Sequence, residues 1–109
     1  MTVDARVLER LFATVEARRG ADPDGSYTAR LLAKGPAAVA KKVGEEAVET
    51  VLEAMQARPD RLAAESADLL YHLLVLWAAC GVRPEEVWSV LAAREGRSGI
   101  AEKASRPPE

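Results

Sequence analysis

The chain has 109 residues, which suits one domain with one hydrophobic core, and hydrophobic residues make up 49% of it. Its formal charge of -2 gives no strong basic field, so we expect neither nucleic acid nor a membrane surface as a partner. Aromatic residues account for only 5%, while alanine, leucine and glutamate are abundant, and this composition favours helices over strands.

The N-terminal sequence predicts a helix rather than a leader peptide. Apolar residues recur at helical spacing between Val3 and Arg18, and MTVDARVLERL lacks the apolar core of a secretory signal. The single cysteine, Cys80, has no partner for an internal disulfide, and its apolar neighbours predict a buried thiol. A reducing compartment follows, so we expect a cytoplasmic protein.

Two helices follow the loop GADPDGS. Ser26 or Thr28 can cap a short helical segment that reaches Leu32. A long helix is then predicted from Pro36 to about Ala57, because proline suits the first position of a helix. Its broad apolar face consists of Val43, Ala47, Val48, Val51, Leu52 and Met55.

The next helix, predicted over residues 61–80 with Asp60 as its N-cap and Gly81 at its end, is unusually apolar. Its second half, LLYHLLVLWAAC from Leu69 to Cys80, offers apolar side chains in nearly every direction. This run is too short to cross a bilayer. Because one small helical domain cannot cover it on all sides, we expect a homodimer.

The remaining residues predict one more helix and a tail. The helix runs from Pro84 to about Arg94, and the sequence after it, GRSGIAEKASRPPE, is polar enough for us to expect partial mobility. We therefore expect an all-α domain over residues 1–95 and a polar C-terminal tail over residues 96–109. The domain is predicted to be a bundle of four to five helices that homodimerisation completes.

Acidic residues fall at matched positions of the two long helices. Glu46 and Glu49 are three residues apart on the first helix, and such residues are neighbours on its surface. Glu65 and Asp68 repeat this spacing on the second helix. In an antiparallel hairpin that turns near Arg58, both pairs reach the same level, and helices in contact are only about 8–10 Å apart. The four carboxylates are therefore predicted to converge.

Such a cluster is costly without a cation, because like charges at this spacing destabilise a helix. The positions four residues further on hold no firm cation: they are Thr50, Glu53, Leu69 and His72. Oxygen-only ligation suits Mg²⁺, or Mn²⁺, whereas zinc and di-iron sites use Cys and His ligands that this pattern lacks. The alternative interpretation is a solvated acidic face.

At these residues the sequence resembles a known superfamily. GEEAVE at Gly44–Glu49 and ESADLLYHLL at Glu65–Leu74 resemble the EExxE…ExxD signature of the all-α, MazG-like nucleotide pyrophosphohydrolases. More narrowly, SYTARLL at Ser26–Leu32, KKVGEEAVE at Lys41–Glu49 and the tail GRSGIAEKASR at Gly96–Arg106 are similar to the phosphoribosyl-ATP pyrophosphohydrolase family.

The resemblance implies hydrolysis of phosphoribosyl-ATP to phosphoribosyl-AMP and pyrophosphate, the second step of histidine biosynthesis. It also implies Mg²⁺ dependence and a dimer. By the matched signature, the metal ligands are expected to be Glu46, Glu49, Glu65 and Asp68. They would hold an ion that bridges phosphate oxygens and orients a water for attack at the α–β linkage.

Glu45 completes the candidate catalytic set with Glu46 and Glu49. It can accept the proton of the attacking water or orient the groups around the metal. Its alternative role is a surface pair with Lys41 or Lys42.

Several further side chains are candidates for binding the substrate. Lys41 and Lys42 precede the acids by about one turn and can hold phosphate, although both also suit a solvated surface. Arg30 and Lys34 are candidates for the ribosyl 5′-phosphate. His72 follows Asp68 by one turn and is either a contact to the substrate or metal surroundings, or a purely structural histidine.

Two rival functions remain open at this point. One is a sibling enzyme that hydrolyses a canonical or damaged nucleoside triphosphate. The other is a helical dimerisation module without catalysis, which would gain no stability from Mg²⁺.

Overall fold

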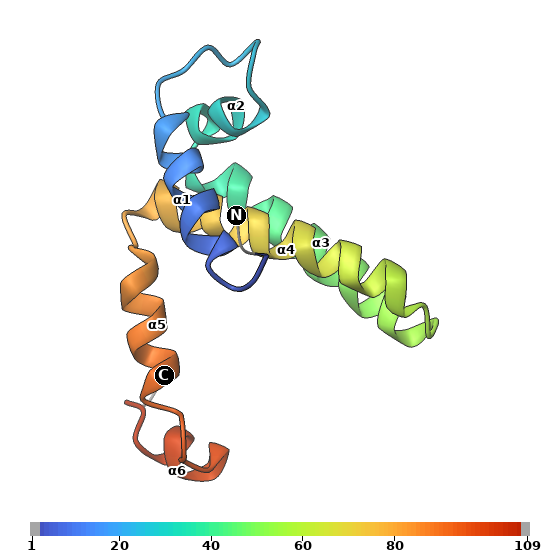
Figure 1. Cartoon of the computed structure of the whole chain (residues 1–109), viewed down its shortest axis with the longest axis vertical. Helices are drawn as coiled ribbons and strands as arrows, with labels where there is room; N and C mark the ends of the chain where they lie inside the picture. Colours follow the sequence, from blue (N-terminus) through green and yellow to red (C-terminus); the bar gives the residue numbers. More distant parts are fainter. Residues whose placement is uncertain (1–2, 108–109) are drawn as a thin grey trace.

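The computed structural model describes residues 3–107, which contain six α-helices and no strand (Figure 1). The helices are α1 (Val7–Ala17), α2 (Tyr27–Lys34), α3 (Pro36–Met55), α4 (Pro59–Cys80), α5 (Pro84–Ala92) and α6 (Gly99–Ala104). The all-α prediction is confirmed. The number of helices exceeds the predicted four to five because part of the tail forms α6, where the Ser98 hydroxyl accepts a hydrogen bond from the Ala101 N–H at 3.0 Å.

The division into a domain over residues 1–95 and a tail over residues 96–109 stays a prediction, and residues 1–2 and 108–109 lie outside the described part. The ends of the predicted helices differ from the observed ones by a few residues. α1 begins at Val7 rather than Val3, and α5 ends at Ala92 rather than Arg94.

The helices α3 and α4 form a long antiparallel hairpin that extends away from the rest of the chain (Figure 1). Proline occupies the first position of each, at Pro36 and Pro59, where its fixed φ suits the helix and its missing N–H costs nothing. The turn between them includes Ala57, which has a positive φ of 54°. This short turn places the two predicted acidic pairs on adjacent helices.

Local caps set the other helix ends. Ser26 begins α2, where its hydroxyl accepts a hydrogen bond from the Ala29 N–H at 3.1 Å, as predicted. Gly81 ends α4 in the left-handed conformation with a φ of 74°, also as predicted. The predicted N-cap at Asp60 is wrong, because the helix already begins at Pro59 and Asp60 lies within its first turn. There the carboxylate still suits the helix dipole.

The buried core lies where α1 and α2 cross the base of the hairpin. Its fully buried members come from four helices: Val15, Leu31, Val39, Val75 and Ala78. Phe12 and Tyr71 pack against this core from its edges. The core therefore fixes one end of α3 and α4, while the end near the turn extends beyond it.

Most of the predicted apolar face of α3 is exposed in the single chain. Val48 and Val51 are each 59% exposed, Leu52 is 51% exposed and Met55 is 79% exposed. These four residues lie on the part of the hairpin that α1 and α2 do not reach. The pattern correctly identified an apolar face, but residues 3–107 leave these four side chains mostly uncovered.

The helix α4 is long and apolar enough, by length and composition alone, to cross a membrane, with a mean hydropathy of 1.3 over an 18-residue window. The prediction that this segment is too short to cross a bilayer considered only its most apolar run and not the whole helix. The core helix of a soluble protein passes the same test. Cys80 at its end is exposed, so the predicted burial of its thiol is wrong for the single chain.

The helices α5 and α6 run away from the hairpin (Figure 1). Trp88 on α5 packs edge-to-face against Trp77 on α4, with ring centroids 5.9 Å apart. Val90 and Leu91 on α5 remain more than half exposed, at 54% and 51%.

Candidate functional site

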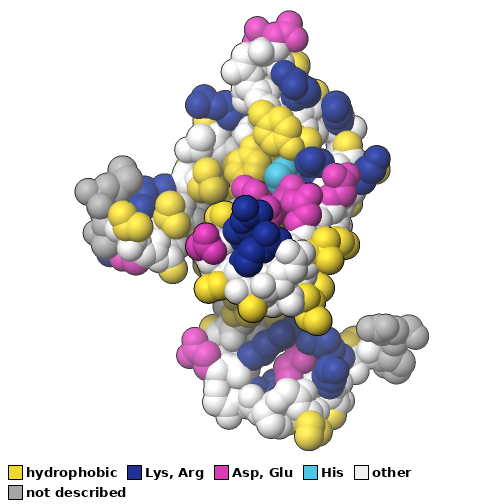
Figure 2. All heavy atoms as spheres, turned by 90° about the vertical axis from the view of Figure 1, so that its right-hand side faces the viewer, with side chains coloured by type: hydrophobic (Ala, Val, Ile, Leu, Met, Phe, Trp, Pro, Cys, Tyr) yellow, Lys and Arg dark blue, Asp and Glu magenta, His cyan; other side chains and the backbone are white. Residues whose placement is uncertain are grey.

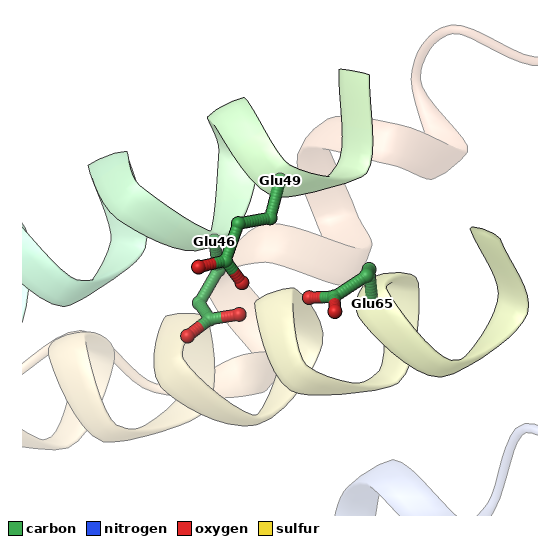
Figure 3. Close-up of side chains that lie close together, drawn as sticks. All are labelled: Glu46, Glu49 and Glu65. Carbon is green, nitrogen blue, oxygen red and sulfur yellow. The ribbon is translucent and has the colours of Figure 1, made fainter. Parts of the chain in front are cut away.

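The facing sides of α3 and α4 bring three of the four predicted acids together. Glu46 and Glu49 project from α3 toward Glu65 on α4, and one carboxylate oxygen of each lies within 4.8 Å of the others (Figure 3). We call these three residues the acidic cluster. The i, i+3 spacing on α3 and the short turn at Ala57 together produce this convergence.

The acidic cluster contains oxygen atoms without hydrogen-bond partners. Glu46 is buried, with 8% of its surface exposed. Oε2 of Glu46 and Oε2 of Glu65 are both inaccessible, and neither has a hydrogen-bond partner among the described residues. A buried carboxylate oxygen without a donor is costly, so this geometry calls for a cation or a proton between the helices.

The carboxylates raise one another's pKa values. The hydrogen bond to Glu49 is the main cause that raises the pKa of Glu65 to about 7, and partial burial and the charges of Glu49 and Glu46 add to it. Burial raises the pKa of Glu46, and the charge of Glu49 raises it further. A divalent ion that bound here near neutral pH would therefore displace a proton from Glu65.

The donor set fits a hard cation. All three members of the acidic cluster offer carboxylate oxygen, and no cysteine or histidine atom belongs to the group. Such oxygen ligands are those that Mg²⁺ and Mn²⁺ prefer, and Mg²⁺ usually keeps several of its waters or takes phosphate oxygens in the remaining positions. The acidic cluster therefore can hold a divalent ion together with a phosphate-bearing ligand.

Asp68, the fourth predicted ligand, lies outside this group of mutually close oxygens. Its side chain is exposed, and its charge contributes to raising the pKa of both Glu46 and Glu65. Asp68 therefore lies beside the acidic cluster, and its role as a ligand stays a prediction.

Glu45 and Glu53 lie on α3 close to the acidic cluster but have cationic partners instead. Glu45 is exposed, and its carboxylate is 3.8 Å from the Lys42 ammonium, which is the alternative that the sequence left open. Glu53 pairs with Arg58 at 2.7 Å. The catalytic role of Glu45 stays a prediction.

In the part of the chain that the structure describes, none of the predicted phosphate-binding cations forms an ion pair with Glu46, Glu49 or Glu65. Lys41 is exposed, one turn from Glu45, and Lys42 forms the ion pair just described. The Arg30 guanidinium donates to the Pro23 carbonyl oxygen at 3.3 Å from two of its nitrogens, in the loop before α2. Lys34 is exposed in the last turn of α2. Their substrate-binding roles stay predictions.

His72 lies one turn beyond Asp68 and is buried, with 6% of its surface exposed. Its Nδ1 lies 2.8 Å from the Asp68 carbonyl oxygen and its Nε2 lies 3.1 Å from the Tyr27 hydroxyl. The predicted contact of His72 with substrate stays a prediction. Tyr27 itself was not singled out from the sequence, although it belongs to the SYTARLL segment that carried the family resemblance.

Figure 2 looks at the turn end of the hairpin and shows how these groups share one face. The single histidine of the chain (cyan) lies beside acidic side chains (magenta), and hydrophobic side chains (yellow) continue beyond it. An acidic region that held a divalent ion, next to a hydrophobic region, would suit a ligand with a phosphate chain and a base.

Comparison with known proteins agrees with this geometry. A model of the phosphoribosyl-ATP pyrophosphohydrolase family matches residues 8–95, which include all of α3 and α4. A protein of Azospirillum brasilense named phosphoribosyl-ATP pyrophosphatase is 62% identical over 104 residues, which cover 95% of this chain and 94% of the relative.

Two further relatives carry the same name. The protein of Cereibacter sphaeroides strain ATCC 17029 is 66% identical over 100 residues, or 92% of this chain and 97% of the relative. That of Paramagnetospirillum magneticum is 57% identical over 106 residues, or 97% of both chains. With a family match over most of its length and relatives of this similarity, the chain belongs to the phosphoribosyl-ATP pyrophosphohydrolase family.

Proposed function

We propose that this chain hydrolyses phosphoribosyl-ATP to phosphoribosyl-AMP and pyrophosphate, the second step of histidine biosynthesis, with Mg²⁺ held at the acidic cluster. The observation that carries the proposal is the convergence of Glu46, Glu49 and Glu65, two of them with oxygens that lack partners. The family match and the names of the relatives support the substrate.

Each candidate residue has a proposed role that follows from its position. Glu46, Glu49 and Glu65 would hold the ion, with Asp68 at the edge of the cluster as a fourth ligand. When bound, Mg²⁺ supplies positive charge to the phosphate oxygens and makes a bound water more acidic. Glu45 on the exposed side of α3 accepts the proton of the attacking water. Lys41, Lys42, Arg30 and Lys34 contribute positive charge toward the phosphates.

The exposed apolar surface supports a homodimer. The side chains of Val48, Val51, Leu52 and Met55 are all more than half exposed on adjacent turns of α3. A contiguous apolar surface of this kind is characteristic of an interface between protein chains. A second copy covering it would complete the bundle. As a soluble enzyme of amino-acid biosynthesis, the protein acts in the cytoplasm.

A substrate panel tests the proposal. Pyrophosphate release is measured from phosphoribosyl-ATP, ATP, dCTP and dUTP, each with Mg²⁺ and with EDTA. The proposal predicts Mg²⁺-dependent release from phosphoribosyl-ATP and little from the others. Faster release from a nucleoside triphosphate would instead identify a sibling enzyme, and no release from any substrate would favour the dimerisation module.

A further inference from the structure

Tyr27, the first residue of α2, forms a hydrogen bond with His72, the buried histidine next to the acidic cluster. The Tyr27 hydroxyl lies 3.1 Å from Nε2 of His72, although 45 residues separate them in the chain. The Nδ1 atom of the same ring lies 2.8 Å from the Asp68 carbonyl oxygen. Both nitrogens of a buried imidazole are therefore in hydrogen-bond contact with protein atoms.

The partners of His72 determine its protonation pattern. A carbonyl oxygen can only accept, so the hydrogen of the neutral ring is on Nδ1 and is donated to Asp68. The Nε2 atom is then an acceptor, and the Tyr27 O–H donates to it. Without Tyr27 the lone pair of Nε2 would be unsatisfied in a buried place, and the ring would lose one of its two polar anchors.

Aromatic contacts hold the same ring from the side. His72 packs edge-on against Tyr71, with ring centroids 5.0 Å apart, and edge-on against Tyr27 at 6.0 Å. The Tyr71 hydroxyl is bonded to the Thr28 hydroxyl, so α2 is attached to α4 by a second hydrogen bond that does not involve His72.

The position of His72 affects the acidic cluster. His72 and Glu46 are both buried, and the histidine lies beside acidic side chains in Figure 2. The hydrogen bond from His72 Nδ1 to the Asp68 carbonyl oxygen attaches the ring to the turn of α4 that carries Asp68. A change in the ring's orientation would therefore alter the space beside Glu46 as well as this turn.

We propose that Tyr27 is a positioning residue for the acidic cluster and that it acts through its hydrogen bond to His72. The proposal rests on the proposed function, since the acidic cluster is taken to hold Mg²⁺. Tyr27 itself contacts neither the ion nor the reacting phosphates. It holds His72 in one orientation, and His72 keeps Glu46 and the Asp68 turn in the geometry that the ion requires. Groups that orient metal ligands in this way are part of the site.

The test uses Tyr27→Phe, which removes only the hydroxyl, with Tyr71→Phe as its matched control. Each variant loses one hydroxyl bond between α2 and α4, but only Tyr27→Phe breaks the bond to His72. We expect Tyr27→Phe to raise the Mg²⁺ concentration for half-maximal activity by about tenfold, with KM for the nucleotide unchanged. Tyr71→Phe should keep the Mg²⁺ dependence of the wild type.

A second variant tests the route through His72. His72→Asn retains a donor near the Asp68 carbonyl but has no ring nitrogen to accept from Tyr27. If Tyr27 acts through His72, adding Tyr27→Phe to His72→Asn should cause no further loss. A further loss in the double variant would show that Tyr27 acts by another route and would overturn the proposal.

A spectroscopic measurement does not depend on turnover. Because the chain has a single histidine, the ¹⁵N signals of its imidazole are assigned without ambiguity. In metal-free protein, Tyr27→Phe should shift the Nε2 signal of His72. When Mg²⁺ is added, the rise in Tm should be smaller for Tyr27→Phe than for the wild type. Tyr71→Phe should show neither effect. An unchanged Nε2 signal, or wild-type stabilisation by Mg²⁺ in Tyr27→Phe, would contradict the proposal. These readouts apply even if the wild type fails to hydrolyse phosphoribosyl-ATP, which would overturn the proposed function alone.

Discussion

The carboxylates of Glu49 on α3 and Glu65 on α4 face each other across the hairpin, with oxygen atoms within 4.8 Å. Their contact raises the pKa of Glu65 to about 7, because a hydrogen bond to Glu49 favours the protonated form. A proton on Glu65 and the proposed divalent cation would therefore compete for the same space. The predictions below follow from this competition and from the exposed apolar face of α3.

The stability of the metal-free protein should depend on pH through Glu65. Its pKa is about 7 in the folded chain and 4.5 in a model peptide, so the folded state binds more protons between these values. The free energy of unfolding should fall as pH rises through this window. Thermal melting in EDTA across the window should show this loss in the wild type and less of it in Glu65→Gln, whose amide stays neutral. Equal slopes for the two proteins would contradict the assignment.

Removing one charge from the acidic cluster should stop catalysis without unfolding the chain. Glu49→Gln should lower kcat by roughly a hundredfold or more, as expected for loss of a charged group in the site, while the far-ultraviolet circular dichroism stays that of the wild type. Glu53→Gln is the matched control, because Glu53 lies one turn further along α3 and pairs with Arg58. Activity retained in Glu49→Gln would remove Glu49 from the ligands.

Mg²⁺ should stabilise the folded chain by mass action. At a concentration of one hundred times its Kd, a ligand that binds only the folded state adds about 2.7 kcal/mol to the free energy of unfolding. We therefore expect differential scanning calorimetry to show a higher Tm with Mg²⁺ than with EDTA, and a smaller difference for Glu46→Gln. An identical Tm under both conditions is the result that a dimerisation module without a metal site would give.

The exposed face of α3 should hold two copies together. Val51→Glu places a charge on a side chain that is 59% exposed at the centre of this face, and burying that charge in a dimer would be costly. Sedimentation velocity should find a dimer for the wild type and a monomer for Val51→Glu. Lys41→Gln changes the net charge by the same amount away from this face and should remain a dimer. A monomeric wild type would show that the face is not an interface between copies.

The parts of the fold that local rules determine could be predicted from the sequence. Pro36 and Pro84 begin their helices and Gly81 ends α4, because proline and glycine have strong backbone preferences that need no tertiary context. The approach of acids from the two long helices was also predictable, since helix periodicity and a short turn fix the register of a hairpin. The register placed Glu49 opposite Asp68, whereas the structure brings Glu49 to Glu65.

The sequence could not show which apolar residues the single chain covers. The periodicity of α3 identifies an apolar face correctly, but Met55 is 79% exposed because the hairpin extends beyond the other helices. Cys80 is exposed at the C-terminal end of α4, although Ala78 belongs to the core and Ala79 packs against it. The bond between Tyr27 and His72 joins segments far apart in the chain, and no local pattern reports such a contact.

Crystals grown with Mn²⁺ in place of Mg²⁺ provide the most direct test of the metal site. The anomalous difference map should show a peak between α3 and α4, bound by carboxylate oxygens of Glu46, Glu49 and Glu65. Density at that position that disappears in crystals of Glu49→Gln is the expected result. A map with no peak there, in which the three side chains turn away from one another into solvent, would contradict the account.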